Sequence, residues 1–271
     1  MNNATPCAEP PILLTRREGK ALVVTLNRPE RLNALTPELH AQLREAVESA
    51  AHDRSVTALV LTGAGRAFCS GGDMNNGSAR GEARPGLEQR ADELRHHAET
   101  ARLLHSMPKP TIAMINGAAA GAGLALALAC DLRIASSDAV LRTAYANVAL
   151  SGDLGISWFL TRLVGPAKAL ELMYLNEKIA AAEALGLGLV NRVEAPDDLA
   201  EAALSIAAQL ADGPGVALRY MKRNVTLSAQ APLEMVLDTE AYGMARCGRT
   251  QDIKEAVLAF REKRAPSFTG T

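Results

Sequence analysis

A single acidic residue, Asp153, lies within the stretch SGDLGISW. Its neighbours Leu150, Leu154, Ile156 and Trp158 are apolar. An apolar environment disfavours the ionised carboxylate and raises its pKa above the free value of about 3.9, which makes it a better proton acceptor. Asp153 is therefore a candidate acid or base, or a nucleophile. The alternative is a helix N-cap, because aspartate in such a sequence also commonly begins a helix.

Two glycine-rich turns are the next candidates for chemistry. GRAFCSGGD occupies 65–73, directly after an apolar run, and NGAAAGAG occupies 116–123, before an apolar helical pattern. Small residues let a ligand approach the backbone, and a helix start presents unpaired N–H groups towards negative charge. Each turn could supply one hydrogen-bond donor, or each could be only a tight turn. Neither matches GxGxxG or GxxxxGK[ST], so neither indicates a dinucleotide or P-loop nucleotide site.

Composition restricts the classes of function. The chain has 271 residues, a formal net charge of −1, and 48% hydrophobic and 22% charged residues. This is typical of a globular protein with one large core, without the basic excess of a nucleic-acid-binding protein. Cys7, Cys69, Cys130 and Cys247 show no CxxC spacing and no adjacent histidine cluster, so we expect no metal site. Scattered thiols and an N-terminus that lacks a signal-peptide pattern favour a cytoplasmic location.

The order of patterns predicts an α/β core. Apolar runs predict strands and 3.6-residue periodicity predicts helices. We expect a hairpin at 12–17 and 21–27, strands at 56–62, 111–115, 132–135 and 139–141, and helices at 37–52, 87–106, 154–163 and 166–175. A polar, glycine-bearing segment at 75–85 predicts a mobile loop.

Two further regions complete the domain organisation. The uncharged stretch 111–130 has the length of a membrane span, but Asn116-Gly117 favours a buried strand, a turn and a buried helix, so we expect no membrane span. Amphipathic patterns predict helices at 197–210, 216–227, 233–245 and 252–263. We therefore expect an α/β core over 1–195 and a helical region over 196–271.

Five motifs, in this order, resemble those of the crotonase superfamily, also called the enoyl-CoA hydratase/isomerase family. They are LNRPERLNAL (26–35), GRAFCSGGD (65–73), INGAAAGAGLALALACDLRIAS (115–136), LTRLVGPAKALEL (160–172) and AFREKRAPSF (259–268). The resemblance implies a crotonase-like ββα spiral core with a C-terminal α-helical trimerisation region. It also implies an acyl-CoA thioester substrate, with coenzyme A as part of that substrate and no bound cofactor. We expect a homotrimer or homohexamer.

The resemblance assigns roles to individual residues. The backbone N–H groups of Gly72 and Ala122 would hold the thioester oxygen as negative charge develops on it. Residues expected to bind the substrate are Arg28, Leu32, Ala34 and Ser70, with Tyr145 in the acyl pocket and Phe260 and Lys263 reaching the nucleotide from a neighbouring subunit. Tyr145 would hydrogen-bond the acyl group or form the pocket wall. The alternative for Lys263 is a solvated cation.

The chain departs from the water-adding members of that family at both of their glutamates, which are replaced by Ala125 and Tyr145. Asp153 instead matches the aspartate of dienoyl-CoA and 1,2-epoxyphenylacetyl-CoA isomerases. With one acid, the resemblance favours isomerisation over hydration. The alternatives are an aspartate-nucleophile hydrolase or dehalogenase, a hydratase, and a catalytically silent acyl-CoA binding protein. In the dehalogenases a histidine assists, but we expect His96, His97 and His105 to lie on the surface.

Overall fold

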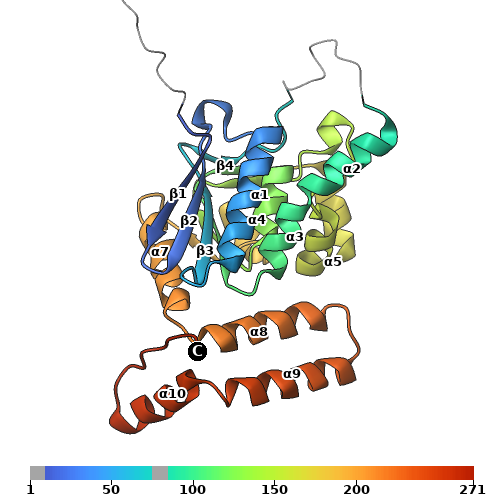
Figure 1. Cartoon of the computed structure of the whole chain (residues 1–271). Helices are drawn as coiled ribbons and strands as arrows, with labels where there is room; N and C mark the ends of the chain where they lie inside the picture. Colours follow the sequence, from blue (N-terminus) through green and yellow to red (C-terminus); the bar gives the residue numbers. More distant parts are fainter. Residues whose placement is uncertain (1–9, 75–84) are drawn as a thin grey trace, which may run out of the picture.

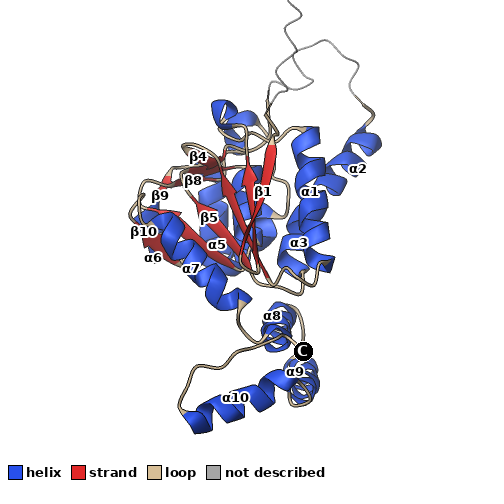
Figure 2. Ribbon diagram, turned by 60° about the vertical axis from the view of Figure 1, so that its left-hand side comes forward, coloured by secondary structure: helices blue, strands red, loops and turns tan. Residues whose placement is uncertain are grey.

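The computed structural model describes residues 10–74 and 85–271, so the loop predicted at 75–85 falls almost wholly outside the described residues. The larger sheet is mixed: its first two strands form the predicted antiparallel hairpin, and the other neighbours are parallel. Its strands, in order across the sheet, are β1 (Leu13–Glu18), β2 (Ala21–Leu26), β3 (Ala58–Gly63), β5 (Thr111–Ile115), β7 (Leu132–Ser136) and β10 (Arg192–Glu194). The predicted α/β class is therefore confirmed (Figure 2).

A second, smaller sheet was largely missed by the sequence analysis because its strands have only two or three residues. In order they are β4 (Ala67–Cys69), β6 (Ala118–Ala120), β8 (Val140–Arg142) and β9 (Ile179–Ala180). Strands β4 and β6 arise inside the two glycine-rich turns and pair in parallel, with Ala67 opposite Ala118. This pairing holds the two turns side by side.

Both faces of the larger sheet are buried, because alternate residues of its strands enter two different clusters. Val24, Leu59 and Ala113 belong to the larger cluster, whereas their neighbours Val23 and Val60 belong to the smaller one. Continuous apolar runs are typical of parallel strands covered on both faces. The helices whose residues enter the larger cluster are α1 (Pro37–His52), α3 (Glu99–Ser106), α4 (Ala122–Ala129), α5 (Ile156–Leu175) and α6 (Ala181–Gly186).

Helix α7 (Leu199–Ala211) covers the other face of the sheet through Leu199, Ala203, Ala207 and Ala211. The sequence analysis placed this helix in the C-terminal region, but its contacts are with strands β3, β5 and β7. The helices that project from the core are therefore the three that follow it.

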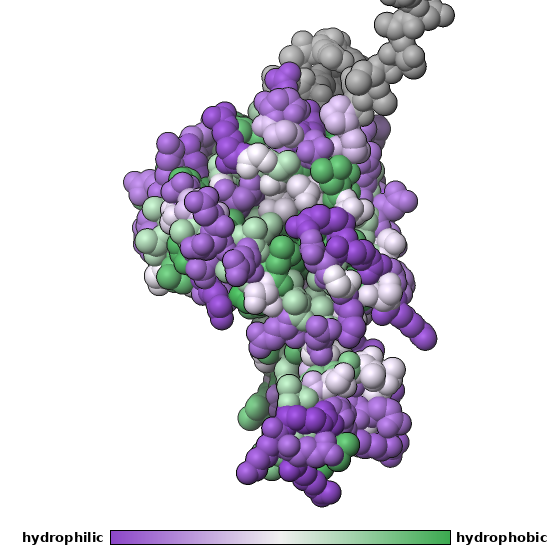
Figure 3. Space-filling view, turned by 90° about the vertical axis from the view of Figure 1, so that its left-hand side faces the viewer, coloured by the Kyte–Doolittle hydropathy of each residue, from purple (hydrophilic) through white to green (hydrophobic). Residues whose placement is uncertain are grey.

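Those three helices are α8 (Gly215–Ser228), α9 (Leu233–Cys247) and α10 (Gln251–Glu262), and they form a separate layer below the core (Figure 1). Lys222 of α8 joins this layer to the core: its Nζ lies 2.9 Å from Asp131 Oδ2 and donates to the carbonyl oxygens of Leu104 and Lys109. The layer forms a narrow lobe beneath the globular part (Figure 3).

Two predicted helices differ in detail. The helix expected at 87–106 is divided at Ala98 into α2 (Leu87–His97) and α3. The two helices expected at 154–163 and 166–175 together form α5, which is interrupted at Gly165 (φ 77°) immediately before Pro166. The stretch 111–130 forms the predicted strand (β5) and helix (α4), with the short strand β6 in place of the expected turn. No helix of the described residues is long and apolar enough to cross a membrane.

Candidate active site

The two glycine-rich turns touch at Gly71 and Ala122. Gly71 has φ 101°, a conformation that favours glycine, and a Cβ atom added there would lie 3.0 Å from Ala120 O and 3.5 Å from Ala122 N. Only a residue without a side chain brings the backbones this close. The strand pairing of β4 with β6 and this contact together bring Gly72 and Ala122 to one place.

Gly72 and Ala122 both offer a backbone N–H at this junction. Gly72 is exposed, and a Cβ added to it would meet nothing within 4 Å. Ala122 is the first residue of α4, where a helical N–H has no partner within its own helix. In the described part of the chain, neither amide donates to a backbone or side-chain acceptor. The roles predicted for these two amides in binding a thioester oxygen remain predictions, but their positions are suited to it.

The segment 32–35 runs beside the first turn. Leu35 N–H donates to Gly71 O at 2.8 Å, Asp73 N–H donates to Leu35 O at 2.9 Å, and Ser70 N–H donates to Leu32 O at 3.0 Å. Three of the residues predicted to bind the substrate, Leu32, Ala34 and Ser70, are thereby placed next to the amide of Gly72.

Arg28 holds this segment in place. Its guanidinium donates to Ala34 O at 2.5 Å and to Asp73 Oδ2 at 3.0 Å, with 16% and 8% of the Arg28 and Asp73 side chains exposed. Sequence reasoning predicted a coenzyme A contact for Arg28 and missed this ion pair. It also missed the fully buried Asn33, whose side-chain amide donates to the carbonyls of Ala64 and Ala67.

Asp153 faces Tyr145 rather than the end of a helix. Helix α5 begins at Ile156 after Gly155, and no side chain caps it, so the N-cap alternative for Asp153 is wrong. The hydroxyl of Tyr145 instead donates to Asp153 Oδ1. Burial raises the pKa of Asp153, as its apolar neighbours predicted, while the hydrogen bond from Tyr145 and the positive charges of His97 and Arg90 act in the opposite direction.

Ala125 and Tyr145 occupy the two positions at which the sequence analysis noted missing glutamates. The Ala125 side chain is fully buried in α4, and Tyr145 is 7% exposed in the same apolar cluster. Asp153 is therefore the acidic side chain that the described structure places against Tyr145. A single acid of raised pKa is suited to moving a proton.

Two of the three histidines expected on the surface, His97 and His105, are partly buried. His97 is half-buried at the end of α2, its ring stacks on His40 of α1, and its charge acts on the pKa of Asp153. His96 is exposed, as expected. His105 is partly buried and packs edge-on against Trp158 and Phe159. The sequence contained no signal for the stack, because its two rings come from different helices and from residues 57 positions apart, 40 and 97.

Phe260 and Lys263 are not brought to this site within the chain. Phe260 is 85% exposed on α10, and Lys263 follows that helix in a left-handed conformation. The layer of α8, α9 and α10 lies at the opposite end of the core from α2 (Figure 1). The role predicted for these residues in a neighbouring subunit's site remains a prediction.

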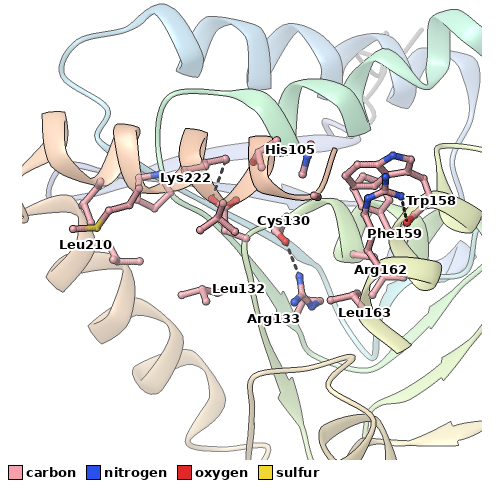
Figure 4. Close-up of a pocket in the computed structure, with 18 residues that line it drawn as sticks. His105, Cys130, Leu132, Arg133, Trp158, Phe159, Arg162, Leu163, Leu210 and Lys222 are labelled. Carbon is pink, nitrogen blue, oxygen red and sulfur yellow. Dashed lines mark hydrogen bonds and ion pairs between the residues drawn. The ribbon is translucent and has the colours of Figure 1, made fainter. Parts of the chain in front are cut away.

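An apolar cavity of about 470 Å³ lies elsewhere, between α8 and the core (Figure 4). It is lined by Leu128 and Cys130 from the far end of α4, together with Trp158, Phe159 and Met221. Asp153, Gly72 and Ala122 do not line it. This apolar cavity is thus separate from Asp153 and the two backbone amides.

An α/β fold with paired backbone amides at glycine-rich turns and a partly buried carboxylate is typical of enzymes that act next to a carbonyl group. A model described as enoyl-CoA hydratase/isomerase matches residues 16–271. The chain is 38% identical over 260 residues to a 1,2-epoxyphenylacetyl-CoA isomerase of Escherichia coli (95% of this chain, 98% of the relative). It is 35% identical over 262 residues to a crotonyl-CoA hydratase of Syntrophomonas wolfei (94% and 97%).

The structure agrees with these similarities. It resembles the crystal structure of an enoyl-CoA hydratase from Bacillus anthracis with a TM-score of 0.90 at 31% identity, covering 96% of this chain and 100% of the other. The chain belongs to the enoyl-CoA hydratase/isomerase family, and the crotonase-like fold that the motifs implied is confirmed. It is an acyl-CoA enzyme of that family.

Proposed function

We propose that this enzyme isomerises an enoyl-CoA or a related ring acyl-CoA. The amides of Gly72 and Ala122 hold the thioester oxygen, so that removal of a neighbouring proton gives a stabilised enolate. Asp153 removes that proton and returns it further along the acyl group. Coenzyme A enters as part of the substrate, and no other cofactor takes part.

The observation that carries this proposal is the partly buried Asp153, whose partner is a neutral phenol rather than a second acid. Addition of water by a pair of glutamates needs two carboxylates, and Ala125 and Tyr145 supply neither. Relatives carry both isomerase and hydratase names, so the carboxylates, not the names, support isomerisation.

The test is Asp153→Asn, which keeps the shape of the side chain but cannot act as a base. Turnover should fall by about 10²–10⁴-fold while acyl-CoA binding, measured by calorimetry, changes little. Substrates should be found by screening aliphatic and aromatic acyl-CoA thioesters for double-bond movement and for hydration. Unchanged turnover in Asp153→Asn contradicts the proposal, and binding without turnover of any thioester favours a silent binding protein.

His97 gives specific support to a second function, displacement or hydrolysis. Asp153 would attack a substrate carbon, expel the leaving group and form an ester, and a water that loses its proton to His97 would hydrolyse that ester. Burial lowers the pKa of His97, so its ring is neutral and able to accept a proton at pH 7. Mass spectrometry of enzyme quenched during turnover should then show an adduct on Asp153. Absence of the adduct, and of oxygen from labelled water in the product, would eliminate this function.

The C-terminal layer supports assembly as a homotrimer or homohexamer. Its helices expose large apolar side chains, including Val225 (72%), Leu233 (68%), Met244 (78%) and Phe260 (85%). Exposed apolar side chains gathered in one region are typical of surfaces buried between subunits. Sedimentation should give three or six times the mass of 28.6 kDa, and a monomer would contradict this.

A further inference from the structure

Tyr145 is buried, and its hydroxyl donates to one carboxylate oxygen of Asp153. Within residues 10–74 and 85–271, the other oxygen, Oδ2, accepts no hydrogen bond. We propose that Tyr145 is a positioning residue, which holds Oδ1 so that Oδ2 alone faces the substrate and takes up and returns the proton. This inference rests on the proposed function, because it specifies which atom of Asp153 reacts.

Tyr145 acts as a donor and not as a second acid. Burial, followed by the negative charge of Asp153, raises the pKa of the Tyr145 hydroxyl well above its usual range. The phenol therefore keeps its proton at neutral pH. Its hydrogen bond favours the ionised form of Asp153, in which the carboxylate can accept a proton.

The backbone around the pair is unusual in a way that fixes its geometry. Ala144, Ala149 and Leu154 have φ values of 65°, 56° and 48°, although none of them is glycine. Such left-handed residues persist only where the surrounding structure holds them. On one side this is done by Asn176, which is buried in a left-handed conformation at the end of α5 and accepts the N–H of Ala144 at 2.6 Å. The chain is thus constrained immediately before Tyr145 and immediately after Asp153.

Other charged or titratable groups act on the same carboxylate. Cys69 of β4 is fully buried, and burial raises its pKa to about 12, so its thiol stays neutral. His97 and Arg90 of α2 lower the pKa of Asp153, but less than Tyr145 does. Loss of the hydroxyl therefore removes the largest influence that opposes the effect of burial.

The test is Tyr145→Phe, which keeps the ring in the apolar cluster and removes only the hydroxyl. The pH below which kcat/KM declines should move upward by about one unit, because the pKa of Asp153 rises. At a pH on the acidic side of this decline, kcat of Tyr145→Phe should be about tenfold lower than kcat of the parent, while KM stays within about twofold of the parent value. The matched control is Tyr174→Phe, which removes a hydroxyl from a tyrosine that is 72% exposed and should leave the profile unchanged. Equal melting temperatures of variant and parent establish that the fold is kept.

A second measurement separates this inference from the proposed function. Carbon-13 NMR of labelled aspartate, assigned with Asp153→Asn, reports the pKa of Asp153 without turnover. An unchanged NMR pKa and pH profile in Tyr145→Phe overturn the positioning role even if Asp153 proves essential. A raised NMR pKa together with normal turnover in Asp153→Asn instead overturns the proposed function and leaves the effect of Tyr145 on Asp153 established.

Discussion

The imidazole rings of His40 and His97 lie parallel, with centroids 4.2 Å apart and an interplanar angle of 2°. His40 is 9% exposed, and in the described residues its Nδ1 atom has no hydrogen-bond partner. Burial, and then repulsion from His97, lowers the pKa of His40 to about 4. Because the pKa of His97 is also lowered, both rings are neutral at pH 7, and His97 carries a charge only in more acidic solution.

This depressed pKa predicts a loss of stability in mild acid. Between pH 6.5 and pH 4 the unfolded chain binds a proton at His40 that the folded chain does not, so the free energy of unfolding falls as the pH falls. With an unfolded pKa of about 6.5, the loss between pH 7 and pH 5 is about 2 kcal/mol. Urea unfolding at pH 7 and pH 5 should be measured for the parent and for His40→Phe, which keeps a stacked ring but cannot titrate. The free energy of unfolding lost between the two pH values should be about 2 kcal/mol smaller in the variant.

The matched control for the histidine stack is His96→Gln, which alters an exposed residue of the neighbouring helix. It should retain the pH dependence of the parent. The explanation fails if His40→Phe loses as much stability between pH 7 and pH 5 as the parent does.

The amide of Ala122 can be removed with little harm to α4. Proline is favoured at the first position of a helix because the N–H there has no partner within the helix. Ala122→Pro should therefore keep the melting temperature within a few degrees but reduce kcat/KM by at least about 10²-fold. Ala122→Gly, which keeps the amide, should retain most of the activity. Equal kcat/KM in the proline and glycine variants would show that this N–H takes no part.

The ion pair of Arg28 with Asp73 should contribute to stability. Arg28→Ala removes the guanidinium from a carboxylate whose side chain is only 8% exposed, which should lower the free energy of unfolding by about 3 kcal/mol. The comparison is Arg95→Ala, which breaks a pair with Glu99 in which the arginine side chain is 66% exposed and should cost less than about 1 kcal/mol. Similar urea midpoints for the two variants would mean that Arg28 does not anchor the 28–35 segment.

Two glycines of the turns should respond differently to alanine. A Cβ on Gly123 would lie 2.3 Å from Cys69 O and 2.6 Å from Cys69 Cβ, so Gly123→Ala should destabilise the protein by about 3 kcal/mol or prevent folding. A Cβ on Gly72 meets nothing within 4 Å, so Gly72→Ala should change stability by less than about 0.5 kcal/mol. Thermal unfolding distinguishes the two, and a stable Gly123→Ala protein would contradict the close contact of α4 with β4.

Much of the fold could be predicted from local patterns. The hairpin of β1 and β2, the buried strands β3 and β5 and helix α1 all have clear periodicity. The short strands β4 and β6 could not be predicted, because three residues such as Ala-Phe-Cys or Ala-Ala-Ala are too few to show a strand pattern. They are strands only because they pair with each other, 51 residues apart at Ala67 and Ala118. The assignment of α7 to the sheet also depends on contacts with β3 and β5, which an amphipathic pattern does not specify.

In the site, too, some features follow from the local sequence and others depend on contacts between distant residues. The raised pKa of Asp153 follows from its apolar neighbours in the sequence, and the glycine at 71 permits the close approach of the two turns, although their pairing through β4 and β6 was not predictable. The contact of Tyr145 with Asp153 depends instead on left-handed Ala149 and Leu154, which no sequence rule predicts for such residues. The His40 stack likewise depends on how α1 and α2 pack.

The full burial of Ala125 in α4 limits how this scaffold can evolve. A glutamate introduced there by one mutation would bring a charge and four further heavy atoms into the buried apolar cluster, which is strongly destabilising. A change of chemistry would therefore have to begin with neighbouring side chains becoming smaller, before any new acid was gained. The packing around Ala125, as well as selection for the reaction product, therefore keeps the descendants of this chain at a single carboxylate.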